Sequence, residues 1–226
     1  MRLLAIETAT EACSVALWIG GEVRERFEVA PRRHTGLVLP MIEQLLAEAE
    51  LTLPQLDLLA FGRGPGSFTG VRVATSMIQG IAFARDLGVV PISTLTALAQ
   101  GAERESGAGR VLAAIDARMG ELYWSACVAS SGIMRPLGEE RLVTPQTVPV
   151  PEEGEGQWYG VGSGWDSHGT ILRERLQTRL AGCHPGRYPH AQDVARLAVE
   201  AVAEGARPLP AEQAQPVYLR NRVVFS

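Results

Sequence analysis

The sequence contains one pattern of strands and acids twice, and this repeat constrains its fold more than any other feature. Leu3-Leu4-Ala5-Ile6-Glu7 is an apolar strand that ends in an acid, and a short turn separates it from a second strand at residues 13–18. Val111-Leu112-Ala113-Ala114-Ile115-Asp116 ends in the same way and leads through Met119-Gly120 into residues 122–128. Residues 157–164 also echo residues 59–64. The pattern predicts a diverged duplication of a lobe made of a β-hairpin and a βαβ unit.

Each half shows further elements by the periodicity of its apolar residues. In the first half we expect strands at 2–9, 13–18, 23–29, 56–61 and 89–92, and helices at about 36–49, 70–86 and 94–104. In the second half we expect strands at 111–116 and 122–128, an exposed loop at 148–156, a helix whose stripe runs from Ile171 to Leu180, a helix at 193–204 and an extended tail at 216–225. Gly, Ser and charged residues concentrate at 102–109, which predicts lobes at 1–105 and 106–226, with a tail that could return to the first lobe.

A glycine-rich turn, residues 62–70, lies between an apolar strand and a helix, with Ser67 or Thr69 as the candidate N-cap. Such a turn aims backbone N–H groups at one point and suits a phosphate, but its glycines can equally serve only to make a tight turn. The 21 basic residues are all arginine, so a P-loop lysine and a Schiff-base lysine are excluded. Any phosphate contact must come from backbone N–H groups, Arg, Ser or Thr.

Composition limits the classes of partner. The net charge is −4, which is not typical of a chain that binds nucleic acid by itself. Arg24, Arg26, Arg32 and Arg33 alternate with glutamates at 22, 25 and 28, so a solvated face is the better interpretation. The three cysteines are widely spaced, which favours reduced thiols and a cytoplasmic protein. We find no signal peptide and no apolar run near the roughly 20 residues of a membrane span.

Four motifs occur in a fixed order: Leu4-Ala5-Ile6-Glu7-Thr8-Ala9-Thr10, Gly64-Pro65-Gly66-Ser67-Phe68-Thr69-Gly70-Val71-Arg72, Ala114-Ile115-Asp116-Ala117-Arg118 and Pro216-Val217-Tyr218-Leu219-Arg220. Together they closely resemble the TsaB (YeaZ) family, bacterial subunits of the machinery that makes threonylcarbamoyladenosine in tRNA. The resemblance covers essentially the whole chain. It implies an α/β fold of two duplicated RNase H-like lobes, as in the actin, sugar-kinase and Hsp70 superfamily.

The resemblance also implies a function. A TsaB-like chain binds TsaD and keeps it active, and TsaD transfers threonylcarbamoyl to an adenosine beside the tRNA anticodon. Partners implied in this way are TsaD, the ATPase subunit TsaE and a second copy of the chain, with tRNA reached only through the complex. TsaD carries a metal-binding His-x-x-x-His pair, whereas Leu95 and Ala99 occupy the matching positions here. Apolar side chains cannot ligate a metal, so we expect no catalytic residue, no metal and no cofactor.

Active members of the superfamily hold Mg²⁺ and a nucleotide with acids on the two hairpins. Glu7 and Asp116 occupy these positions, and Gly64, Gly66 and Ser67 complete the weak candidates for a nucleotide site. The alternative for Glu7 is a strand-end carboxylate that accepts nearby N–H groups, which we prefer. A small ATPase or phosphotransferase of the same fold remains the rival function. A peptidase has no support, because Ser67 lacks the G-x-S-x-G frame and no Ser-His-Asp order is evident.

The helices at 36–49 and 70–86 are the candidate partner surface. Their apolar stripes must pack on a sheet, so residues off the stripes are left for a partner. We predict an interface of Leu39, Val71, Thr75, Gln79 and Gly80, where glycine permits a close helix approach. A four-helix contact, formed by two helices from each of two chains, is what the family resemblance implies for the homodimer and for the TsaD heterodimer.

Overall fold

The structure is a computed structural model that describes residues 1–151 and 156–220, and it divides into two compact units. Unit 1 contains Met1–Ala97 and Pro189–Val217, and unit 2 contains Leu98–Tyr188 with the residues from Tyr218 to the end of the described chain. This division differs from the predicted lobes at 1–105 and 106–226, because the last helix joins the first unit. The boundary falls inside one helix, α3 (Thr94–Ser106).

Unit 1 is built on a five-stranded sheet with the order β3-β2-β1-β4-β5. Its strands are β1 (Arg2–Glu7), β2 (Ala12–Ile19), β3 (Glu22–Val29), β4 (Leu58–Gly62) and β5 (Val89–Ile92). The first three strands form an antiparallel meander, and β1, β4 and β5 run parallel. The carboxyl ends of the parallel strands therefore meet at one edge, where Glu7 and the glycine-rich turn lie.

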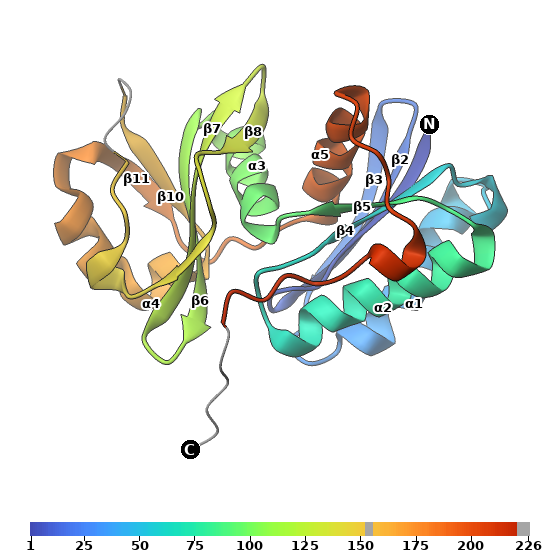
Figure 1. Cartoon of the computed structure of the whole chain (residues 1–226), viewed down its shortest axis with the longest axis horizontal. Helices are drawn as coiled ribbons and strands as arrows, with labels where there is room; N and C mark the ends of the chain where they lie inside the picture. The colour runs from blue at the N-terminus through green and yellow to red at the C-terminus, as the bar shows by residue number, and fades with distance from the viewer. Residues whose placement is uncertain (152–155, 221–226) are drawn as a thin grey trace. The chain divides into compact units, whose positions relative to one another are not determined.

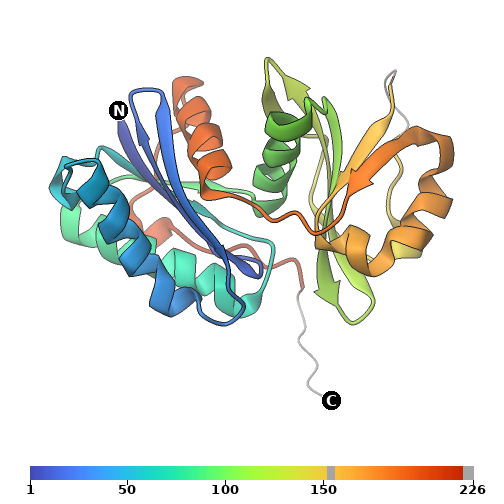
Figure 2. The same cartoon turned by 180° about the vertical axis from the view of Figure 1, so that it is seen from behind.

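Helices cover both faces of this sheet (Figure 1). α1 (His34–Glu48) and α2 (Phe68–Arg85) lie on one face, where residues such as Ile6, Leu45 and Ile78 form a core from which water is excluded. α5 (Ala191–Ala203) covers the other face, as the view from behind shows (Figure 2). Small side chains such as Ala5, Ala16 and Ala60 line that second face and let the helix approach closely. Burial on two faces explains why β1 is apolar along almost its whole length.

Unit 2 repeats the same topology, and the predicted duplication is confirmed. Its strands are β6 (Arg110–Arg118), β7 (Glu121–Ser130), β8 (Ile133–Pro136), β9 (Arg141–Val143), β10 (Trp158–Val161) and β11 (Leu180–His184). The order β8-β7-β6-β10-β11 matches β3-β2-β1-β4-β5 position by position, with β9 added beside β7. α4 (Ser163–Leu176) packs on a core that contains three tryptophans, Trp124, Trp158 and Trp165.

Several predicted elements of the second half are corrected. The helix does not reach Leu180, because α4 ends at Leu176 and Leu180 begins β11 after a single 3₁₀ turn. Strands β8 and β9 had not been predicted, since each is only three or four residues long. The predicted exposed loop at 148–156 begins with Val148, which is fully buried in the unit 2 core, and residues 152–155 lie outside the described residues. Of the predicted extended tail, only 216–220 is described, without regular structure.

Candidate functional site

Glu7 ends β1 and is almost completely enclosed, with 1% of its surface exposed. The Ala9 backbone N–H donates to its Oε1 at 2.7 Å, and the Thr94 hydroxyl donates to its Oε2 at 2.9 Å. Burial raises the pKa of Glu7 to about 7, against these hydrogen bonds, which act to lower the pKa. The carboxylate therefore works inside unit 1 as an acceptor of local donors, as its preferred interpretation predicted.

The glycine-rich turn is pressed directly onto the hairpin turn that follows Glu7. A Cβ at Gly62 would overlap the Glu7 carboxylate, one at Gly66 would overlap the Ala9 carbonyl oxygen, and one at Gly70 would overlap that of Thr8. The Thr8 hydroxyl also donates to the Gly70 carbonyl oxygen at 2.8 Å. The glycines are thus required for close packing between the first and second family motifs.

Three backbone donors of this turn, those of Gly64, Ser67 and Gly70, have partners within the protein. Ser67 N–H donates to the Ala9 carbonyl oxygen at 2.7 Å, and Gly64 N–H donates to the Thr94 hydroxyl at 3.2 Å. Gly70 N–H donates to the Ser67 hydroxyl at 3.4 Å, which confirms Ser67 as the N-cap of α2. Donors engaged in this way cannot also cradle a phosphate. The geometry favours a structural turn over a phosphate-binding loop.

Asp116 belongs to unit 2 and has partners of its own. Its Oδ1 accepts from the Arg118 backbone N–H at 2.8 Å, and its Oδ2 accepts from the Arg118 guanidinium at 3.0 Å and the Ser167 hydroxyl at 3.2 Å. The structure brings Glu7, Gly64, Gly66 and Ser67 together in unit 1. Asp116 occupies the equivalent strand end of the second repeat.

Leu95 and Ala99, the residues in place of the TsaD histidines, are both fully buried in α3. Within residues 1–151 and 156–220 the structure places no three His, Cys, Asp or Glu side chains where they could hold a metal ion. His34 begins α1, and its Nε2 lies 3.2 Å from the Ala12 carbonyl oxygen, a contact between α1 and β2 within unit 1. In the same described ranges no helix is both long and apolar enough to cross a membrane.

The outward orientation predicted for Val71 and Thr75 is wrong. Val71 is fully buried and Thr75 is 5% exposed, because α2 packs Val71, Ala74 and Ile78 toward the core. The Thr75 hydroxyl donates to the Val71 carbonyl oxygen at 2.8 Å and is satisfied within the helix. Gln79 is half-buried and its amide donates to the Ala214 carbonyl oxygen at 2.8 Å.

The remaining two interface candidates do face outward. Leu39 on α1 is 48% exposed, and an added Cβ at Gly80 on α2 would meet nothing within 4 Å. Ser76 and Phe83 share the exposed side of α2 with Gly80, and Phe83 is 85% exposed. We call Leu39, Ser76, Gly80 and Phe83 the outer helix face. Sequence reasoning missed Ser76 and Phe83 because it assigned the face of Val71, Thr75 and Gln79 to the partner, although that face is buried or half-buried.

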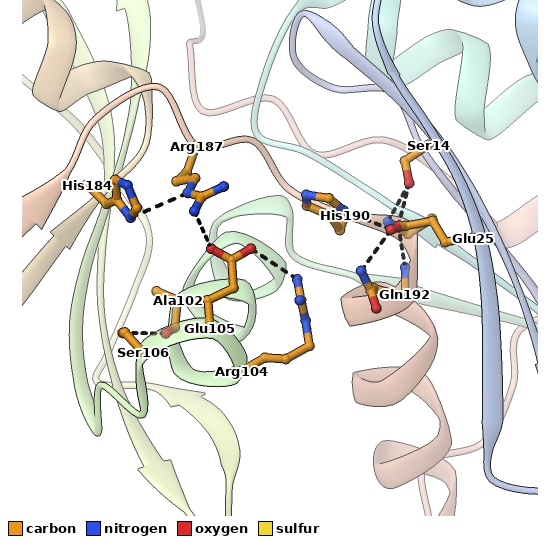
Figure 3. Close-up of polar contacts among 11 residues, drawn as sticks. Ser14, Glu25, Ala102, Arg104, Glu105, Ser106, His184, Arg187, His190 and Gln192 are labelled. Atoms are coloured by element: carbon orange, nitrogen blue, oxygen red, sulfur yellow. Dashed lines mark hydrogen bonds and ion pairs between the residues drawn. The ribbon is translucent and has the colours of Figure 1, made fainter.

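A second polar cluster, in unit 1, was also missed. Glu25 was expected on a solvated face, yet its carboxylate accepts from the Ser14 hydroxyl at 2.7 Å and pairs with His190 Nδ1 at 2.9 Å (Figure 3). Both the backbone N–H and the side-chain amide of Gln192 donate to it, at 3.0 and 2.8 Å. Burial acts to raise the pKa of Glu25, but the hydrogen bond and charge of His190 outweigh it and lower the pKa. His190 and Gln192 lie 165 and 167 residues away in sequence, so no local signal reveals them.

The arginines of that stretch fit the solvated interpretation better. Arg33 pairs with Glu28 at 3.0 Å, and Arg26 pairs with Glu48 of α1, all with substantially exposed side chains. Pairs of this kind contribute little to stability. The charged residues in and next to β3 therefore include exposed side chains that form ion pairs and one carboxylate, that of Glu25, that points inward.

Two repeated lobes, each a three-stranded meander joined to two parallel strands, with an acid at or near the end of the first strand, define the fold of the actin, sugar-kinase and Hsp70 superfamily. The family model described as TsaD, tRNA N6-adenosine threonylcarbamoyltransferase, matches residues 27–155. The TsaB protein of Escherichia coli K12 is 44% identical over 100% of this chain and 97% of its own, and that of Haemophilus influenzae Rd is 42% identical over 100% and 96%. The solved structure of YeaZ from Pseudomonas aeruginosa has a TM-score of 0.89 at 47% identity, covering 96% of this chain and 99% of its own.

This chain belongs to the TsaB family, whose curated members are named tRNA threonylcarbamoyladenosine biosynthesis proteins. The match of its central region to the TsaD family model agrees with the shared duplicated fold. The family resemblance carried by the four sequence motifs is therefore confirmed.

Proposed function

We propose that this chain is a non-catalytic subunit that binds TsaD and keeps it active in threonylcarbamoyl transfer to the adenosine next to the tRNA anticodon. The proposal extends the names of the TsaB relatives to a specific role. The observation that carries it is the outer helix face, which leaves Phe83 85% exposed in unit 1. Contiguous exposed apolar surface marks sites that a protein partner covers, and Phe83 and Leu39 supply such surface on the outward sides of the two helices.

The environment of Glu7 supports the proposal that this chain does not itself catalyse a reaction. A carboxylate that holds Mg²⁺ must be ionised and open to the ion, and oxygen ligands of this kind keep water or substrate around the metal. Glu7 is enclosed, engaged with Ala9 and Thr94, and has a pKa of about 7. These features support a structural role at the position where related enzymes hold a metal.

Docking would use the outer helix face. α1 and α2 lie side by side on one face of the unit 1 sheet, so their outward sides can meet two helices of a partner (Figure 1). Gly80 and Ser76 permit close backbone approach, while Leu39 and Phe83 supply apolar surface. The same surface would serve self-association, so the homodimer and the TsaD heterodimer compete. TsaE joins the TsaD-bound form, and tRNA is reached in the cytoplasm only through the complex.

Paired leucine variants test the docking surface. Leu39 and Leu137 are almost equally exposed, at 48% and 47%, but Leu137 lies in unit 2. We expect Leu39→Arg to weaken TsaD binding at least roughly tenfold in titration calorimetry, since a hot-spot residue at an interface contributes about 1–2 kcal/mol or more. Leu137→Arg should leave the affinity unchanged. Equal effects of the two substitutions would remove the outer helix face from the proposal.

A nucleotide titration distinguishes the proposed role from the rival function, a small ATPase or phosphotransferase. The isolated chain is expected to neither bind Mg-ATP tightly nor turn it over, and to show no transfer activity without TsaD. Depletion of the chain in cells should lower threonylcarbamoyladenosine in tRNA. Turnover by the purified chain that is lost in Glu7→Gln would favour the enzyme instead.

A further inference from the structure

The segment from Arg207 to Val217 leaves α5 and runs back along unit 1 without forming a long helix or strand. We call it the C-terminal strap. Leu209 exchanges two backbone hydrogen bonds of 2.8 Å with Val89, so the strap covers the open edge of β5. Its other end is fixed by the Val217 N–H, which donates to the Arg63 carbonyl oxygen at 2.8 Å. A covered sheet edge is protected from unwanted pairing, but that role alone requires only the contact at Leu209.

The middle of the strap is attached to α2. Ala214 is fully buried in the core that α1 and α2 share, and its carbonyl oxygen accepts from the Gln79 amide at 2.8 Å. Ala211, in the 3₁₀ turn Ala211–Gln213, packs against the same core. One side of α2 packs on the sheet, and a second side of the helix contacts the C-terminal strap.

The strap also reaches the turn from which α2 begins. Val217 lies within the fourth family motif, and its carbonyl oxygen is where a Cβ at Gly64 would make contact, at 3.1 Å. The glycine-rich turn is therefore held between the hairpin turn at Thr8 and Ala9 and the strap at Val217. The beginning of α2 and its middle are both fixed by one segment.

We propose that the C-terminal strap sets the position of α2, and with it the outer helix face, with Gln79 as the positioning residue that joins them. This inference rests on the proposed docking of TsaD to that face. Gln79 points to the strap and takes no part in the docking surface. Its side chain acts on partner binding only through the placement of Ser76, Gly80 and Phe83.

Two variants of the full chain test the strap. Ala214→Glu places a charge at a fully buried position. We expect the strap to leave this position before α1 or α2 shifts, because the strap has the least regular structure there. Gln79→Glu replaces the donor by a carboxylate that faces the Ala214 carbonyl oxygen. We expect TsaD affinity to fall more than about tenfold for Ala214→Glu and roughly fivefold for Gln79→Glu. Hydrogen exchange of α2 amides should rise in the same order, while far-UV circular dichroism stays unchanged.

Gln146→Glu is the matched control, since Gln146 is an exposed glutamine of unit 2, outside the docking helices and the strap. It should change neither exchange in α2 nor affinity, whereas Gln79→Ala should recover part of the loss seen for Gln79→Glu. In the strap variants, rapid hydrogen exchange of the Leu209 and Val217 amides would show that the strap has detached. The inference is overturned if the strap detaches while hydrogen exchange in α2 or TsaD affinity stays at the wild-type value. If Ala214→Glu does not fold, Gln79→Glu decides. If the wild-type chain does not bind TsaD, the proposed function fails, and exchange in α2 still tests the hold of the strap.

Discussion

In both repeats the strand-end acid accepts the backbone N–H two residues further on, but the two acids are buried to different extents. In unit 1, Glu7 is 1% exposed and its pKa is raised to about 7 by burial. In unit 2, the Asp116 side chain is 12% exposed, and it pairs with the guanidinium of Arg118, whose side chain is 72% exposed. The backbones agree in strand order, so the difference comes from the turn that follows each acid. Thr8 and Ala9 fold over Glu7, whereas the chain after Asp116 continues into a bulge.

The glycines show what the duplication preserves. Gly66 and Gly70 in unit 1 lie against backbone carbonyl groups of the hairpin turn, and Gly162 and Gly164 in unit 2 lie against Ala114. In both units, therefore, the turn before a helix packs directly on the first strand or the hairpin turn that follows it. Close packing is the property common to both repeats, and an open carboxylate is not.

The largest effect should come from closing that space in unit 1. In Gly70→Ala the new Cβ overlaps the Thr8 carbonyl oxygen, and backbone cannot move aside as a side chain can. We expect a loss of about 3 kcal/mol or more in the free energy of unfolding, measured with urea. Gly164→Ala should cost less, because its Cβ meets the Ala114 and Leu122 side chains at 2.8 Å. Gly80→Ala, with nothing near, should be neutral or stabilising by up to about 1 kcal/mol.

An ion pair in each unit gives the next comparison. The Glu25 and His190 side chains are only 12% and 19% exposed, whereas those of Arg187 and Glu105 in unit 2 are 44% and 28% exposed (Figure 3). Glu25→Ala should lower the free energy of unfolding by about 3 kcal/mol, because it leaves the Ser14 and Gln192 donors and His190 without their acceptor. Glu105→Ala should cost less than about 1 kcal/mol. Equal losses would mean that the Glu25 cluster is solvated in solution.

The pH dependence of the Glu25 effect has a definite sign. The pKa of Glu25 is lowered below its usual 4.5, so its contribution is present above that value and disappears as the pH falls through the lowered pKa. The gap in unfolding free energy between wild type and Glu25→Ala should therefore narrow in acid. A gap that widened below pH 4.5 would contradict the assigned interactions.

For Glu7 we expect the opposite dependence of the unfolding free energy on pH. Its pKa rises from the usual 4.5 to about 7, so the folded state binds the proton more tightly and loses stability as the pH rises through this window. Relative to Glu7→Gln, the wild type should lose on the order of 3 kcal/mol of unfolding free energy between pH 4.5 and pH 7, at about 1.4 kcal/mol per pKa unit. Urea unfolding at pH 4.5, 6 and 7.5 measures the difference. Parallel curves for the two proteins would place Glu7 in contact with water.

Apolar periodicity was sufficient to predict the duplicated fold and most elements of the first repeat. It failed where elements are short or bound by distant contacts: β8 has four residues, and α5 joins unit 1 from the far end of the chain. Periodicity fixes a helical face only to within about one residue, since neighbours are about 100° apart. Val71 and Thr75 were therefore placed outward, although the helix buries them.

The candidate site was predicted less completely than the fold. The interpretation of Glu7 as an acceptor of local donors agrees with the Ala9 N–H two residues away, whereas its other donor, Thr94, lies 87 residues away. The partners of Glu25 and Gln79 lie 165 and 135 residues away, and no sequence spacing reports such contacts. Polar residues whose partners come from the returning segment 189–217 were consistently assigned to solvent or to an interface.

The smallest expected effect tests the acid of unit 2. Asp116→Asn keeps an acceptor for the Arg118 N–H, removes the charge and replaces the oxygen that accepts from the Ser167 hydroxyl by an amide donor. Because the Arg118 partner lies largely in water, the charge pair contributes about 0–1 kcal/mol, and we expect a loss of less than about 1 kcal/mol in the free energy of unfolding. A larger loss would show that Asp116, like Glu7, holds its turn together. The two repeats would then differ only in how far water reaches the acid, and the structural use of the carboxylate would be common to both.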